Sequence, residues 1–180
     1  DADNPDMIQL SDNVIVTNLG SVTFNRNIFG QNFNSTWING PTGTLTIGGV
    51  LLQTGVLDAS AIGNTINYNG NQAQLVKDSP DGYHNLQLTG SDVKRLERAT
   101  RMTGDLFISS ELSLNGFNLT LEGNWNNVGT FTPVAQDVIF FGTNDQTVTN
   151  ASGETFFNLT INKATGTLSL ANNVTATNRL

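Results

Sequence analysis

The sequence predicts an all-β protein, and more specifically a parallel β-solenoid. Three poor helix formers dominate the 180 residues, with 25 Asn, 23 Thr and 18 Gly. Hydrophobic residues make up 37% of the chain and recur in short alternating runs that end at Gly, Asn or Asp. Similar blocks also return at an interval of about 73 residues. These observations exclude an ordinary helical protein and a disordered chain.

Alternating apolar pairs predict the strands in chain order. Each pair places two apolar side chains on one face of a strand, with one residue between them on the other face. The pairs are Leu45/Ile47, Ile66/Tyr68, Leu86/Leu88, Leu106/Ile108, Leu112/Leu114, Leu119/Leu121, Val138/Phe140, Leu159/Ile161 and Leu168/Leu170. Residues 91–102 are the one segment where a helical turn is an alternative. The matching later segment, 165–170, alternates like a strand, which favours a strand there as well.

An internal repeat covers most of the chain. The block TLTIGG at residues 44–49 returns as NLTLEG at 118–123, and YHNLQL at 83–88 returns as FFNLTI at 156–161. A third block, which ends at Gln74 and lies between the first two in the sequence, returns as the block that ends at Gln146. We therefore predict repeat 1 at residues 44–117 and a truncated repeat 2 at residues 118–180. Residues 1–43 are interpreted as a diverged repeat or a capping segment.

Two architectures bury such strands. In a parallel β-solenoid each coil takes about 18 to 24 residues, so a repeat of about 73 residues makes three to four coils. The alternative is a tandem pair of β-sandwich modules, but about 73 residues is short for an independent sandwich. The solenoid also explains the Asn content, because Asn side chains stacked from coil to coil satisfy one another's donors and acceptors.

The second copy carries the strings GNWNNVGTF at residues 123–131, VIFFG at 138–142 and TFFNLTIN at 155–162. With this series the chain resembles the repeat regions of large secreted surface proteins of Bacteroidota, the adhesin-like proteins exported by the type IX system. The resemblance covers residues 44–180 well and residues 1–43 weakly. It implies an extracellular, cell-surface β-helical stalk or adhesive filament, and it transfers no catalytic residue.

Composition narrows the range of functions. A net charge of −7 with eight scattered cations does not supply the positive stripe that nucleic-acid binding requires. No apolar run approaches the roughly 20 residues that span a bilayer, so no membrane span is expected. The chain has no Cys, which excludes disulfides and thiolate zinc sites. It begins at Asp1 without a signal peptide, and we interpret it as processed or as part of a longer polypeptide.

Reactive residues do not recur between the two copies. An enzyme built on a solenoid would cluster carboxylates with Arg or Lys on one strand face. Here Asp58 aligns with Thr132 and Asp92 aligns with Thr165, whereas the apolar residues, Gly and Asn recur. The only histidine, His84, aligns with Phe157, which favours a structural position over a general base. We therefore predict no enzyme, no catalytic or cofactor-binding site and no cofactor.

Two charged segments are candidate binding sites. Asp1, Asp3 and Asp6 form an alternating run of oxygen ligands that calcium would accept, although the Gly and distal Glu of an EF-hand loop are missing. A solvated boundary is the favoured interpretation, so no metal site is predicted. The basic residues Lys94, Arg95, Arg98 and Arg101 are interleaved with acidic residues, which favours a self-neutralised surface over an acidic-glycan site.

Aromatic residues are the usual platforms for sugar rings when they are exposed. Tyr68 and Tyr83 align with Phe140 and Phe156, and Trp125 aligns with Leu51, so these three are predicted to lie in the core. The fourth candidate, Trp37, has no counterpart in the repeat.

The leading hypothesis is a non-catalytic structural or adhesive segment of a repetitive bacterial surface protein. Its expected partners are further repeats of the same polypeptide, neighbouring surface proteins, glycans, or host and abiotic surfaces. Unpaired strand edges at the ends of a solenoid would favour end-to-end contacts. A carbohydrate-active or carbohydrate-binding β-helix is the alternative. An ice-binding solenoid is a third hypothesis, which would need the pairs Thr44/Thr46, Thr130/Thr132 and Thr147/Thr149 in register on one face.

Overall fold

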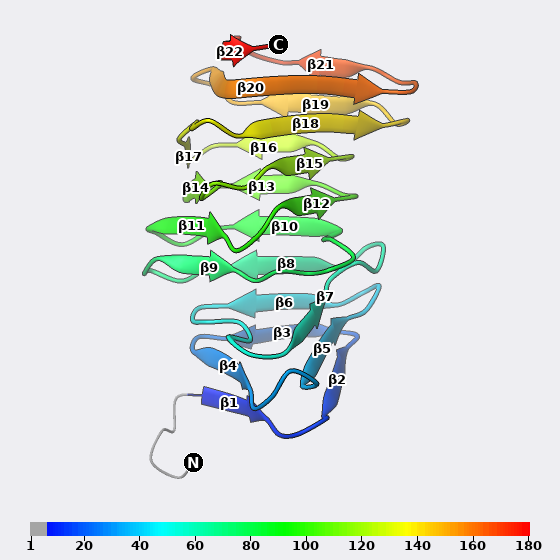
Figure 1. Cartoon of the computed structure of the whole chain (residues 1–180), viewed down its shortest axis with the longest axis vertical. Coiled ribbons are helices and arrows are strands. Elements are labelled where there is room, and N and C mark those ends of the chain that lie inside the picture. Colours follow the sequence, from blue (N-terminus) through cyan, green and yellow to red (C-terminus); the bar gives the residue numbers. More distant parts are fainter. Residues whose placement is uncertain (1–6) are drawn as a thin grey trace.

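A computed structural model describes residues 7–180 and confirms the predicted fold class. All its regular elements are strands, and within the described residues there is no helix. The strands pair in parallel and stack as a β-solenoid of about 9 turns (Figure 1). The turns succeed one another along the long axis, from β1 near one end to β22 at the other. Residues 91–102 form two strands, so the strand prediction for that segment is confirmed.

Each turn visits up to three sheets, of which the first is the longest. This eight-stranded sheet contains β3 (Ser21–Phe24), β6 (Thr44–Ile47), β8 (Thr65–Tyr68), β10 (Asn85–Leu88), β13 (Leu106–Ile108), β16 (Trp125–Asn127), β19 (Gln146–Thr149) and β21 (Leu168–Leu170). In this sheet the shortest turn separates Leu106 from its register partner Trp125, and one of the longest separates Val22 from Leu45. Both lie within the expected coil length, which is therefore confirmed.

The second and third positions of the turns are occupied by shorter sheets. The second position holds β1 (Met7–Leu10), β4 (Asn27–Gly30), β9 (Gln74–Val76), β11 (Val93–Leu96), β14 (Glu111–Ser113) and β17 (Thr130–Phe131). The third position holds β2 (Ile15–Asn18), β5 (Thr36–Asn39), β7 (Val56–Asp58), β12 (Thr100–Met102), β15 (Leu119–Leu121), β18 (Asp137–Gly142), β20 (Glu154–Lys163) and β22 (Val174–Arg179). Single bridges from Ala59 to Tyr83 and from Tyr83 to Met102 connect the two sheets at this third position.

The alternating apolar residues form one continuous core between the sheets. Leu45, Ile66, Leu86 and Leu106 follow one another on successive turns, and each is at most 1% exposed. Burying one such side chain contributes about 1.5–3 kcal/mol. The strands predicted from the last two pairs are present as β20 and β21, but the second residue of each pair is not buried: Ile161 and Leu170 are 49% and 48% exposed. In the described part of the chain β21 is an edge strand, and the pairing of β20 with β22 ends at Asn158, so no following strand pairs with β20 at Ile161.

The repeat found in the sequence spans between three and four turns, so it does not return to the same sheet. Its first block lies in β6 of the eight-stranded sheet, whereas the matching block lies in β15 of another sheet. The local contacts are nevertheless preserved. Gln74 donates from Nε2 to the carbonyl oxygens of residues 47 and 49, at 3.0 and 2.8 Å. Gln146 donates in the same way to those of residues 121 and 123, at 2.9 and 2.8 Å. The repeated sequence thus specifies a corner of the solenoid, where the chain passes from one sheet to the next. The boundaries of the two repeats stay a prediction.

Stacked asparagines line one corner of the first turns, as expected from the composition. Asn18 donates from Nδ2 to Oδ1 of Asn39 at 2.7 Å, and Asn39 donates to Oδ1 of Asn64 at 3.3 Å. All three side chains are buried, at most 5% exposed. Each amide therefore satisfies the amide of the next turn, which removes the cost of burying an unpaired polar group.

Glycine at the corners lets successive turns approach closely, and we expect Gly129→Ala to destabilise the protein. A Cβ at Gly129 would lie 2.1 Å from the carbonyl oxygen of Ser110. Relief requires a backbone shift, so a loss of about 1–3 kcal/mol in the free energy of unfolding is expected in urea titrations. Gly20→Ala is the matched control, because a Cβ there meets nothing within 4 Å. Equal stability of the two variants would contradict close stacking at this corner.

Candidate functional site

The outer surface of the eight-stranded sheet belongs to the sheet with the most strands among the described residues. Because the apolar residues of these strands point inward, the intervening residues point to solvent. We call this surface the amide face, and on the turns from β6 to β19 its outward side chains are Thr44, Thr46, Thr65, Asn67, Asn85, Gln87, Asp105, Phe107, Asn124, Asn126, Thr147 and Thr149. All but two are Thr, Asn or Gln.

A groove of about 600 Å³ runs over the amide face between two rows of side chains. The first row, which we call the Phe107 row, is set by strand register: Asn67, Gln87, Phe107, Asn126 and Thr149 lie side by side on successive turns. Of these five, Asn67 continues the row beyond the residues that line the groove. The lining residues lie on, or directly before, five neighbouring strands, which are β8, β10, β13, β16 and β19. At about 4.8 Å per strand the groove is about 20 Å long.

The second row, which we call the Asp105 row, is held by hydrogen bonds between turns. Asn85 Oδ1 accepts from the Asp105 amide at 3.0 Å. Asp105 Oδ1 in turn accepts from the backbone N–H and the Nδ2 of Asn124, at 2.7 and 2.9 Å. Asn124 Oδ1 then accepts from the Thr147 amide at 2.9 Å. This side of the groove is therefore fixed in place by the fold.

The Phe107 row offers polar groups that the fold does not use. Among the described residues, no group hydrogen-bonds to the side-chain amides of Gln87 or Asn126. These two amides flank the half-buried Phe107 ring in the register of the sheet. An aromatic ring between two such amides is a pattern suited to ligand binding, because the ring supplies an apolar surface and each amide supplies both donors and an acceptor.

None of the aromatic side chains singled out in the sequence is exposed in this groove, although Trp125 is one of the residues that line it. Tyr68 and Tyr83 are at most 1% exposed and Trp125 is fully buried, so their predicted core positions are confirmed. Trp37 is 3% exposed and also belongs to the core. Sequence reasoning missed Phe107, although its place between the inward residues Leu106 and Ile108 marks it as outward.

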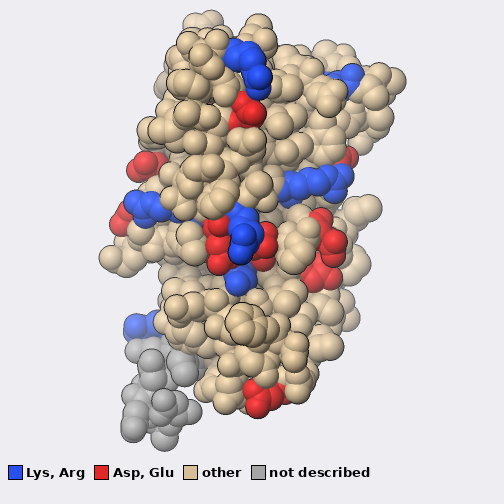
Figure 2. Space-filling model, viewed as in Figure 1, with Lys and Arg blue, Asp and Glu red and all other residues tan. Residues whose placement is uncertain are grey.

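A second candidate is a group of charged residues that directly follow the C-terminal ends of β9 and β11. On the surface shown in Figure 2, Lys and Arg lie beside Asp and Glu in a band at mid-height, and most of the surrounding surface is uncharged. Lys77, Asp78, Glu97 and Arg98, which we call the charged cluster, line a hollow of about 220 Å³. Carboxylates and cations gathered in this way are what an enzyme built on a solenoid would require.

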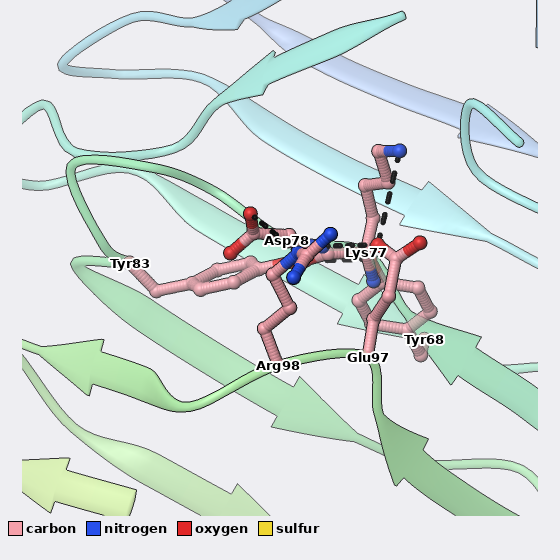
Figure 3. A network of polar contacts seen from close by, with 6 residues as sticks. All are labelled: Tyr68, Lys77, Asp78, Tyr83, Glu97 and Arg98. Atoms are coloured by element: carbon pink, nitrogen blue, oxygen red, sulfur yellow. Dashed lines mark hydrogen bonds and ion pairs between the residues drawn. The ribbon is translucent and has the colours of Figure 1, made fainter. Parts of the chain in front are cut away.

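The charges of this cluster are engaged with one another (Figure 3). Glu97 Oε2 lies 3.7 Å from Lys77 Nζ and accepts from the Asp78 backbone N–H at 2.7 Å. The Asp78 carboxylate lies 3.5 Å from Arg98 Nε. Beneath them the Tyr68 hydroxyl accepts from the Lys77 amide at 2.9 Å. We assign the cluster a structural role, because its groups join neighbouring turns.

The basic residues predicted to form a self-neutralised surface do so only in part. Arg98 pairs with Asp78, and Arg101 pairs with Glu122, so these two are neutralised, each by a residue of another turn. Arg95 is exposed, as a surface residue should be. Arg98 and Arg101 are therefore neutralised as predicted, but by acidic residues of other turns and not by the interleaved Asp92 and Glu97.

The surface prediction is wrong for Lys94, which is fully buried. Its amine donates to the carbonyl oxygens of Gly70 and Ser91 at 2.8 and 2.7 Å. These backbone acceptors replace the water that the ammonium group loses. Burial also lowers the pKa of Lys94.

The remaining candidates from the sequence are His84 and the possible metal ligands, and in the described residues they form no further cluster of reactive side chains. His84 lies with Nδ1 3.1 Å from the hydroxyl of Thr103, and no acidic residue of the described part hydrogen-bonds to it. Within residues 7–180 no three Asp, Glu or His residues are placed to hold a metal ion. Asp1, Asp3 and Asp6, considered as calcium ligands, lie outside the described residues. The same part of the chain contains no helix suited to crossing a bilayer.

The threonine pairs of the ice-binding hypothesis do not form one array. Thr44/Thr46 and Thr147/Thr149 lie on the amide face, but Thr130 belongs to β17 in a different sheet. Between the two pairs on the amide face, Asn, Gln and Phe107 interrupt the threonines. This interruption argues against that hypothesis.

Comparisons of the chain with protein-family models, with curated proteins and with solved structures found no match.

Proposed function

We propose that this chain is a non-catalytic structural and adhesive segment of a large repetitive bacterial surface protein. In this proposal the segment lies outside the cell, attached to the surface, and forms part of a stalk or filament. Further repeats of the same polypeptide or neighbouring surface proteins continue the rod, and glycans or host and abiotic surfaces are its adhesion targets. The resemblance of residues 44–180 to type IX adhesin-like repeats supports the location.

The amide face is the observation that carries the proposal. It extends along the rod over most of the eight-stranded sheet and presents mostly neutral groups that both donate and accept hydrogen bonds. A surface of this kind makes many weak contacts with hydrated polymers, and many copies in one filament multiply their effect. In contrast, the charged cluster is engaged in contacts between turns.

Adhesion of the isolated chain tests this function. Beads coated with the folded chain should be retained on at least one surface of a panel that contains glycan-coated slides, cell layers and bare polymer. Beads coated with the urea-unfolded chain are the control, because they carry the same composition without the amide face. Retention of the folded chain on no surface, or equal retention of both, would overturn the adhesive role.

A further inference from the structure

The groove on the amide face is placed to hold a linear ligand along the axis of the solenoid. It crosses five strands and is open to solvent, so a chain lying in it can continue beyond both ends. One turn advances the groove by about 4.8 Å. An extended polymer whose units have a similar length meets one side chain from each row at each turn.

We propose that this groove binds a neutral polysaccharide, with Phe107 as the ring on which one sugar stacks. This inference rests on the proposed adhesive function and names its ligand. Phe107 presents its ring from the middle of the Phe107 row. The apolar C–H face of a pyranose packs on such a ring, and its equatorial hydroxyls then point sideways toward Gln87 and Asn126. Those two amides have no partner among the described residues.

The electrostatics of the groove favour an uncharged ligand. Its lining contains no Lys or Arg, and Asp105 is its one ionisable side chain among the described residues. The carboxylate of Asp105 accepts two hydrogen bonds from Asn124 and holds the wall of the groove. A uronate or sulfated glycan would meet no cation in that lining, and the protein as a whole carries a net charge of −7.

A polysaccharide fits this groove better than an extended peptide does. Peptides usually bind to sheets by pairing with an exposed strand edge, which supplies main-chain hydrogen bonds. The groove lies over the face of the sheet, where the strands β8 to β19 already pair with neighbours on both sides. Only side chains are therefore available, and their amides match hydroxyl groups.

Affinity electrophoresis in gels that contain one soluble polysaccharide at a time tests the proposal. The neutral probes are xyloglucan, galactomannan, dextran and laminarin, and the acidic probes are alginate and polygalacturonate. The chain should be retarded by at least one neutral probe. Phe107→Ala should weaken that binding about tenfold, which corresponds to one aromatic stacking contact. Gln87→Ala with Asn126→Ala should also weaken it.

Phe141→Ala is the matched control, because Phe141 is also an outward phenylalanine but lies on β18, where its ring contacts Arg101. It should bind like the original chain. Absence of retardation by every neutral probe, retardation by acidic probes only, or binding that Phe107→Ala leaves unchanged would each overturn the proposal. Release of adhered beads by an extended Asn-rich peptide, but by none of the neutral glycans, would overturn it in favour of a peptide ligand.

Two outcomes separate this inference from the proposed function. If beads coated with the Phe107→Ala variant adhere as well as the original beads, the adhesive function stands but the groove is not its binding site. If a gel that contains a neutral polysaccharide retards the chain, but beads coated with the chain adhere to no surface, the inference about the groove stands and the adhesive function is overturned.

Discussion

Alkaline pH is expected to unfold this protein in the same step in which its tyrosines ionise. Tyr68 and Tyr83 are the only two tyrosines, and they are 0% and 1% exposed. Their hydroxyls lie 3.2 Å apart, and the Tyr83 hydroxyl also donates to the Lys77 carbonyl oxygen. Burial raises the pKa of both above the ordinary 10.0, and for Tyr83 the neighbouring tyrosine raises it further.

The sign of the effect follows from proton binding. Above pH 10 the unfolded chain loses its tyrosine protons while the folded protein retains them, so stability present below that pH is lost as pH rises. Each proton contributes about 1.4 kcal/mol per pH unit, and the two tyrosines together about 2.7. The lowered pKa of Lys94 acts in the opposite direction up to its ordinary value of 10.5, so the net loss is expected mainly above that pH.

Tyrosinate absorbance and the β-sheet circular dichroism signal should therefore change together in an alkaline titration. Since both tyrosines are buried, no exposed tyrosine contributes to the absorbance change. Tyr83→Phe should roughly halve the pH dependence of the unfolding free energy. Arg98→Ala is a control from the same cluster, because it removes a mostly exposed partner of Asp78 and no tyrosine proton. Absorbance that rises near pH 10 in a protein with an unchanged β-sheet signal would contradict the buried pair.

The strands and the core were predictable because their signal is local. Leu106 and Ile108 reveal their inward direction by a period of two, which any short window contains. The length of a turn was predictable only as a range, since it changes from turn to turn and leaves no fixed period in the sequence. The two repeats are similar in sequence because they form corners with the same hydrogen bonds, such as those made by Gln74 and Gln146. These corners lie on different sheets.

The groove could not be predicted from the sequence, because its position depends on the register between strands of successive turns. Alternation marks Phe107 as outward, but the residues beside it come from the preceding turn and the following turn. No motif in the sequence joins Gln87, Phe107 and Asn126. The surface prediction for Lys94 failed for a related reason. A lysine is expected at the surface, whereas backbone carbonyl oxygens from residues 70 and 91 converge on this amine at an inward position.

A buried carboxylate near the last turns also escaped sequence reasoning, and its removal should have a large effect on stability. Glu154 is 4% exposed, and its Oε2 accepts from Trp125 Nε1 at 2.7 Å and from Asn127 Nδ2 at 2.8 Å. Its Oε1 accepts from the Thr155 amide at 3.2 Å. In the described chain β20 follows β19 with no strand at the second position between them, so this carboxylate satisfies core groups where that strand is missing.

Glu154→Leu should lower the free energy of unfolding by about 3–5 kcal/mol, because two buried donors on Trp125 and Asn127 lose their acceptor. Glu154→Gln retains one acceptor oxygen for those donors and should cost about 1 kcal/mol. Glu111→Leu is the control, because Glu111 points outward from β14 and a change within about 0.5 kcal/mol is expected. Urea unfolding followed by tryptophan fluorescence measures all three. Should Glu154→Leu be as stable as the original chain, burying the carboxylate would cost as much free energy as its hydrogen bonds contribute.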